Sequence, residues 1–180
     1  MGSSGGPSGG TSGGSSDASS VGASAESSSR SSRETSAESN MGFAMNRLEW
    51  LLSKIEGKIG VYSDDDKEFW LKLKETRKDI DISFHPFVED KDTLVVSEIL
   101  SHVEDPQKTL NELKGRAKKL LITVPNEYSW DLKYNPFKNP KHKRHYDTES
   151  LAQELETAGL TYQLGIVDYD GWSFLVAVAK

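Results

Sequence analysis

The sequence predicts an α/β domain with a mostly parallel sheet, and two apolar runs with a helix between them carry this prediction. Thr93–Val96 and Leu120–Val124 have the length and the β-branched content of buried strands. The helix begins well at Asp105-Pro106, because Asp is a good N-cap and Pro loses no needed N–H at the first helical position. Its apolar residues keep helical spacing as far as Ala117. Strand, helix and strand form a βαβ unit, whose two strands are parallel.

Four elements are predicted before this unit. Asn46–Gly57 is an amphipathic helix with a glycine at its C-terminal end. Lys58–Ser63 reads as a strand. A helix follows through about Arg77. The acidic run Asp64–Asp66 lies in its first turn, where negative charge suits the positive end of the helix dipole, so we expect these residues to cap the helix. Ile80–Phe84 then alternates as a second strand.

Three more elements and one long loop are predicted after it. Tyr128–Tyr146 is irregular and rich in aromatic and basic residues, which is typical of a lid or binding loop. Asp147–Gly159 is a capped helix. Tyr162–Asp168 and Trp172–Ala179 are strands joined by a short Asp-Gly connection, a strong hairpin signal. The sum is a Rossmann-like three-layer sandwich, with a mostly parallel sheet and a C-terminal antiparallel hairpin.

Composition divides the chain into a tail and one domain. Residues 1–44 are rich in Ser and Gly and cannot bury enough apolar surface to offset the entropy of ordering, so we expect them to be disordered. This tail reads either as an engineered linker or tag or as a natural low-complexity segment. Residues 45–180 have the size of a single domain with one core.

Charge and residue usage exclude several classes of protein. The chain contains no cysteine, so disulfides and thiolate metal sites are excluded and nothing indicates secretion. No stretch has the roughly 20 apolar residues that a membrane span needs. The net charge of −6 argues against general nucleic-acid binding. We therefore expect a cytoplasmic protein that binds neither a membrane nor nucleic acid.

Three segments resemble those of class I S-adenosylmethionine-dependent methyltransferases. Ser97–Pro106 (SEILSHVEDP) is similar to the family's S-E-V-L-E-H-V-x-D-P segment, and Thr123–Glu127 (TVPNE) to its T-V-P-N turn. His142–Leu151, followed by Ala158–Leu160, resembles its H-x-R-x-[FY]-[ST]-x-E-x-L…A-G-[FL] block. The resemblance covers about Thr93–Lys180 and implies a methyltransferase fold, with S-adenosylmethionine as the cofactor.

The family's first-half cofactor motifs have no clear counterpart, and two alignments are open. In the first, Lys58–Ser63 is the family's first strand, and Asp64–Asp66 stands where a glycine-rich turn should approach the cofactor. In the second, the same segment is the family's second strand, so that Tyr62 takes the place of the ribose-binding acid, with Asp64 two residues late. In both, the domain is shortened by about one strand–helix unit.

Polar residues at the predicted strand ends and in the basic loop are the candidate site. The resemblance implies cofactor binding by Tyr62, Asp64, Ser97 and Glu98. A proton could be taken by His102 or His145, since histidine titrates near neutral pH. Candidates for holding the acceptor are Asn126, Tyr128, His142 and Arg144. Each of them has an ordinary alternative as a solvated loop, turn or backbone-bonded residue.

The basic cluster that runs from Lys138 to His145 suits an anionic substrate, because arginine binds phosphate and carboxylate in bidentate fashion. We expect no metal site there, because His142 and His145 lack an obvious third ligand.

The sequence supports three functional hypotheses. The first is a methyltransferase acting on a small or anionic acceptor. The second is a methyltransferase-like domain that has lost its cofactor and serves as a binding or scaffold module, as the missing glycine turn suggests. The third is an engineered, minimised domain. A sheet short of one strand would also expose an edge to a protein partner or to a second copy of the chain.

Overall fold

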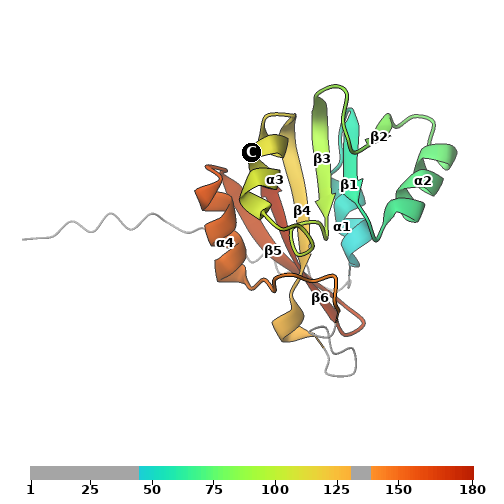
Figure 1. The fold of residues 1–180 in the computed structure, drawn as a ribbon. Helices are drawn as coiled ribbons and strands as arrows, with labels where there is room; N and C mark the ends of the chain where they lie inside the picture. The colour runs from blue at the N-terminus through green and yellow to red at the C-terminus, as the bar shows by residue number, and fades with distance from the viewer. Residues whose placement is uncertain (1–44, 131–138) are drawn as a thin grey trace, which may run out of the picture. The chain divides into compact units, whose positions relative to one another are not determined.

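A computed structural model describes residues 45–130 and 139–180. The predicted tail and Lys138 lie outside these residues. Six strands of the described part form one sheet in the order β2-β1-β3-β4-β6-β5 (Figure 1). Their bounds are β1 Ile59–Ser63, β2 Ile82–Phe84, β3 Lys91–Ser97, β4 Ala117–Pro125, β5 Tyr162–Tyr169 and β6 Trp172–Ala179. The helices are α1 Arg47–Lys54, α2 Lys67–Thr76, α3 Pro106–Lys114 and α4 Thr148–Thr157, with a 3-10 turn, η1, at Glu127–Ser129.

The strands β2, β1, β3 and β4 are parallel to one another, and β6 and β5 complete the sheet as an antiparallel hairpin. The chain passes from β1 outward to β2 and then returns to the other side of β1 to form β3. The strand order therefore reverses between β1 and β3. In open α/β sheets, ligands bind in the crevice at this switch point, outside the carboxyl ends of the strands.

Helices cover both faces of the sheet, as predicted for a three-layer sandwich. Because side chains alternate along a strand, Leu94 and Val96 of β3 face one layer and Val95 faces the other. Leu94 and Val96 belong to a core cluster that includes the buried leucines of α3 and α4. Val95 belongs to a second cluster with Leu51 of α1 and Trp70 of α2.

Helix boundaries follow the capping signals of the sequence. Asn46 and Asp147 form capping boxes at α1 and α4, and Asp105 caps α3 with Pro106 at the first position. The expectation that α3 extends to Ala117 is wrong: the helix ends at Lys114, and Ala117 is the first residue of β4. Gly115 lies directly after Lys114 and ends the helix there, because glycine disfavours a helix interior.

The topology decides between the two alignments left open by the sequence. β1 occupies the inner position beside the switch point, which is the place of the first strand in a doubly wound sheet, so the first alignment is favoured. In the described residues β2 is the outermost strand on its side and has only three residues. In the first alignment, the strand–helix unit that the chain lacks relative to the family would follow β2. No helix in the described ranges is both long and apolar enough to span a membrane.

Candidate functional site

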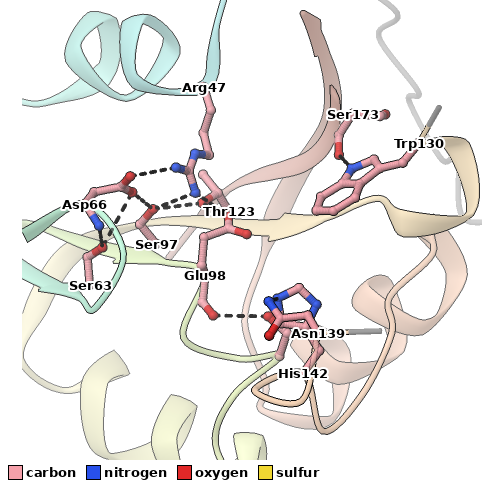
Figure 2. Close-up of polar contacts among 11 residues, drawn as sticks. Arg47, Ser63, Asp66, Ser97, Glu98, Thr123, Trp130, Asn139, His142 and Ser173 are labelled. Carbon is pink, nitrogen blue, oxygen red and sulfur yellow. Dashed lines mark hydrogen bonds and ion pairs between the residues drawn. The ribbon is translucent and has the colours of Figure 1, made fainter. Parts of the chain in front are cut away.

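The carboxyl ends of β1 and β3 meet at a group of charged side chains centred on Arg47 (Figure 2). Arg47 is the first residue of α1, and its guanidinium lies 2.6 Å from Asp66 Oδ1 and 2.8 Å from Glu98 Oε1. The side chains of the arginine and the two acids are 14%, 8% and 5% exposed. Because buried ions need partners, the two carboxylates depend on the guanidinium between them. We call these three residues, together with the hydroxyls of Ser97 and Thr123, the Arg47 network.

The two hydroxyl groups complete the network from neighbouring strands. Ser97 at the end of β3 donates to Asp66 Oδ2 at 2.6 Å, and Thr123 of β4 donates to Glu98 Oε1 at 2.8 Å. The two hydroxyl oxygens are themselves 3.2 Å apart. Five side chains, from α1, β3, β4 and the loops after β1 and β3, therefore converge on the switch point. Ser97 and Glu98, predicted to bind the cofactor, lie here.

Asp66 precedes α2, yet its carboxylate makes no hydrogen bond that caps this helix. It turns instead toward Arg47 and Ser97. The expectation that the acidic run caps α2 is therefore wrong for Asp66. The physical reason is that a buried guanidinium attracts a carboxylate more strongly than one exposed helix terminus does.

Glu98 is held in an unusual environment. Its backbone has φ of +63°, which costs a residue other than glycine some strain and is characteristic of functional sites. Complete burial raises the pKa of its carboxyl group, although Arg47 and Thr123 act to lower it. Burial acts to lower the pKa of Arg47, but the negative charges of Glu98 and Asp66 outweigh the effect of burial, so that the pKa of Arg47 is raised.

Next to the network, the rings of Tyr62 and His85 stack, with centroids 4.0 Å apart. Burial raises the pKa of Tyr62. Because β1 is the first strand and β2 the second, His85 stands where the resemblance places a ribose-binding acid. Tyr62 instead lies inside β1, and Asp64 is an exposed residue of the turn that follows it.

A second polar group lies at the carboxyl end of β4. Glu127, the first residue of η1, places one carboxylate oxygen against Nδ1 of His142 and the other against Nδ1 of His145. The side chain of Glu127 is 1% exposed, and those of the two histidines 4% and 28%. We call these three residues the His–Glu cluster. Glu127 was not predicted as a site residue, although it is the last residue of the TVPNE segment.

His102 adds a fourth polar side chain beside the cluster. Its ring stacks on that of His142 with centroids 5.1 Å apart, and its Nε2 is buried with no hydrogen-bond partner within residues 45–130 and 139–180. The pKa of both histidines is lowered, mainly by burial. The negative charges of Asp65 on His102 and of Glu98 on His142 partly oppose this effect. The Arg47 network and the histidines therefore lie within electrostatic reach of each other.

Residues 139–146, the described part of the basic loop, are docked on the loop after β3. Lys143 donates its backbone N–H to Ser101 O at 2.8 Å, and Arg144 donates to the carbonyls of Val103 and Glu104 at 2.6 and 3.0 Å. Lys141 Nζ lies 3.8 Å from Asp65 Oδ1. These bonds hold the segment that carries His142 and His145 against the loop after β3. Anion binding by Arg144 remains a prediction.

The two other predicted acceptor residues differ in their surroundings. Asn126 is buried, and its amide donates to Ser173 Oγ at 3.0 Å, so it joins the end of β4 to β6. Tyr128 in η1 is 64% exposed. Asn126 therefore has a clear structural role, whereas Tyr128 can be reached from solvent.

Solved structures with the same arrangement of elements are methyltransferases. No model of a protein family matches the chain, and no curated protein does. A methyltransferase from Thermotoga maritima, described as a possible histamine N-methyltransferase, matches with a TM-score of 0.51 and 16% identity, over 70% of this chain and 82% of that one. A putative methyltransferase from Haloferax volcanii, solved with the activator Trm112, matches with a TM-score of 0.51 and 13% identity, over 73% and 87%. This chain has the fold of the class I S-adenosylmethionine-dependent methyltransferases.

The methyltransferase fold explains how the predicted site residues are distributed. Ser97 and Glu98 lie at the switch point, with His142 in the same region (Figure 2). The rings of His102 and His145 both contact that of His142. Arg47 was not predicted as a site residue, because its partners are distant in the chain and α1 was expected only to pack. Asp66 was visible as an acidic residue, but its partner was not.

Proposed function

We propose that the domain binds S-adenosylmethionine in the crevice between the carboxyl ends of β1 and β3, and methylates a small or anionic acceptor held beside the His–Glu cluster. The observation that carries this proposal is the position of Arg47 between Asp66 and Glu98 at the switch point of a methyltransferase fold. Charged groups are buried there at a cost in stability, which is typical of binding sites.

The Arg47 network fits the amino-acid end of this cofactor by charge. That end carries one carboxylate and one ammonium group, and the network offers a guanidinium with a carboxylate on each side. In the proposed complex, Arg47 receives the carboxylate, and Asp66 or Glu98 receives the ammonium. Arginine is well suited to the first role because its fork of donors binds a carboxylate in bidentate fashion.

This use of Arg47 compensates for the missing glycine turn. Asp64, Asp65 and Asp66 carry Cβ atoms where a glycine turn would let the backbone approach the cofactor. The Arg47 side chain, which comes from α1, instead supplies a positive charge that can bind the cofactor's carboxylate. The exposed Asp64 and Asp65 add negative charge at the rim. They favour a cationic sulfonium over the uncharged thioether that remains after transfer.

When bound, S-adenosylmethionine supplies a methyl group activated by a sulfonium, and the protein contributes mainly position and proton transfer. His102 is the proposed general base. Its Nε2 has no hydrogen-bond partner in the described part of the chain, and burial lowers its pKa, so the imidazole is neutral and able to accept a proton. The exposed ring of Tyr128 offers a surface for the acceptor.

A specific observation favours the second candidate, a non-catalytic binding module. The ion pairs of Arg47 with Asp66 and Glu98 give each of the three side chains a partner without a ligand, so the same network could close the crevice. The outer edge of β2 pairs with no other strand in the described ranges, and a free edge can accept a partner strand. Such a module would bind a protein rather than a cofactor.

Calorimetric titration of the full-length chain with S-adenosylmethionine, and separately with S-adenosylhomocysteine, tests the proposal. We expect both compounds to bind. The dissociation constant of S-adenosylmethionine should be micromolar, which corresponds to a binding free energy of about −8 kcal/mol. Because of the acidic rim, S-adenosylhomocysteine, whose sulfur carries no charge, should bind more weakly. Absence of heat at millimolar concentrations of either compound would reject the enzyme and leave the binding module.

A further inference from the structure

We propose that the His–Glu cluster is a binding site for one divalent transition-metal ion, with Glu127, His142 and His145 as the protein ligands. This inference does not rest on the proposed methyl transfer. The ligand atoms of the three residues all lie within 4.8 Å of one another, as a shared ion requires.

The donor set is one that transition metals prefer. Two imidazole nitrogens and one carboxylate suit zinc, iron, cobalt and nickel, whereas magnesium and calcium prefer oxygen ligands alone. Three protein ligands also leave a coordination position for water or substrate, which is the pattern of a catalytic rather than a structural zinc site. Of the three side chains, that of His145 is the most exposed to solvent.

The ligands are positioned before any ion binds. Glu127 lies in the turn directly after β4, and its near-complete burial fixes the carboxylate. The loop that carries both histidines is held by the bonds of Lys143 and Arg144 to the loop after β3. A site formed by two docked elements loses little conformational freedom when it binds an ion.

Asn139 determines which nitrogen of His142 carries the proton. Its Oδ1 accepts from the backbone N–H of Lys141 at 3.0 Å, so its Nδ2 faces His142 Nε2 at 3.1 Å and donates to it. The neutral ring therefore carries its proton on Nδ1, facing Glu127. An ion bound at Nδ1 requires this proton to move to Nε2, and Asn139 must then turn its oxygen toward the ring. No proton is lost from His142 in this exchange.

The experiment uses the full-length chain freed of metal by dialysis against a chelator. Zinc chloride is titrated by calorimetry, and cobalt chloride by the visible absorption of the bound ion. We expect one ion per chain with micromolar or tighter affinity. Glu127→Gln and His145→Gln should each weaken zinc binding by about 100-fold or more, since even groups outside the ligand shell contribute 10–100-fold. His85→Gln, a histidine outside the cluster, should leave zinc binding unchanged.

Two results would overturn the proposal. One is the absence of zinc heat and of a cobalt spectrum at millimolar metal, which would make the cluster a set of hydrogen-bonded ion pairs. The other is unchanged affinity in both ligand variants, which would place the ion elsewhere in the chain. His145→Gln alters the least buried ligand and should stay folded, as far-UV circular dichroism would verify even if Glu127→Gln does not fold.

Asn139→Asp provides a test in the opposite direction. A carboxylate can accept the Nε2 proton that metal binding places there, and carboxylate–histidine–metal arrangements raise ligand basicity. The variant should bind zinc about 10-fold more tightly than the unmodified chain. Weaker binding in this variant would contradict the proposed exchange of the proton.

Discussion

Arg47 Nη2 lies 2.6 Å from Asp66 Oδ1 and so joins the first turn of α1 to the loop that follows β1. In the methyltransferases that the sequence resembles, a glycine turn occupies the position of this loop. In this chain the loop carries a buried ion pair instead. The same guanidinium lies 2.8 Å from Glu98. One side chain therefore links the start of α1 to the carboxyl ends of both β1 and β3.

Removing the positive charge should destabilise the domain strongly. Arg47→Met leaves Asp66 and Glu98 buried without a cation, and breaking a buried pair in this way costs about 3–5 kcal/mol. Urea unfolding followed by circular dichroism would measure the loss. The triple variant Arg47→Met, Asp66→Asn, Glu98→Gln should recover most of it, because no buried charge remains.

Arg77→Met is the matched control, since Arg77 pairs with Asp79 on an exposed part of the surface. We expect no measurable change, because surface ion pairs contribute little. An equal loss in both variants would show that the Arg47 network has no special weight.

The hydroxyl of Ser97 should also be needed for stability. Ser97→Ala removes the donor to Asp66 and leaves part of a buried carboxylate unsatisfied, at a cost of about 1–3 kcal/mol. Ser53→Ala, at an exposed position of α1, removes a similar hydroxyl and should change the free energy of unfolding far less. If the two substitutions have the same effect, the network does not depend on Ser97.

Gly60 in β1 should not tolerate a side chain. A Cβ atom there would lie 2.3 Å from Leu94 Cδ2 and 2.8 Å from Phe87 Cε1. We expect Gly60→Ala to cost about 1–3 kcal/mol through overpacking. Gly115→Ala is the control, because a Cβ there meets nothing within 4 Å and the backbone is right-handed helical. It should be neutral or stabilise by about 0.4–1 kcal/mol.

Stability should depend on pH through Glu98. Its pKa is raised above the ordinary 4.5, so the folded state holds the proton more tightly than the unfolded state does. The favourable contribution is complete below the ordinary pKa and is lost as pH rises through the raised value. Relative to Glu98→Gln, the unmodified chain should therefore lose stability as pH rises from about 4 to 7. A constant difference between the two chains over this range would contradict the raised pKa.

The layers of the fold could be predicted from local patterns. The capping residues Asn46, Asp105 and Asp147 and the turn at Asp170-Gly171, where both residues have positive φ, act over a few positions and are visible in the sequence. The end of α3 was predicted too late, because the spacing of apolar residues continues into β4 and does not mark the change of element.

The candidate site was predictable only in part. Ser97, Glu98 and His102 follow a recognisable strand, so their place at its carboxyl end could be inferred. Arg47 could not, because its partners are 19 and 51 positions away and nothing local distinguishes it from a surface residue of an amphipathic helix. Glu127 was likewise passed over, because only the docked loop brings the two histidines to it.

Comparison of S-adenosylmethionine binding by the full-length chain and by its Arg47→Met and Arg47→Lys variants tests the central proposal most directly. If Arg47 receives the cofactor's carboxylate, Arg47→Met should weaken binding by at least about 10-fold, the equivalent of 1.4 kcal/mol. Arg47→Lys, which keeps the charge and supports folding, should weaken it less. Tighter binding by Arg47→Met would contradict the proposal and show that this side chain closes the crevice instead.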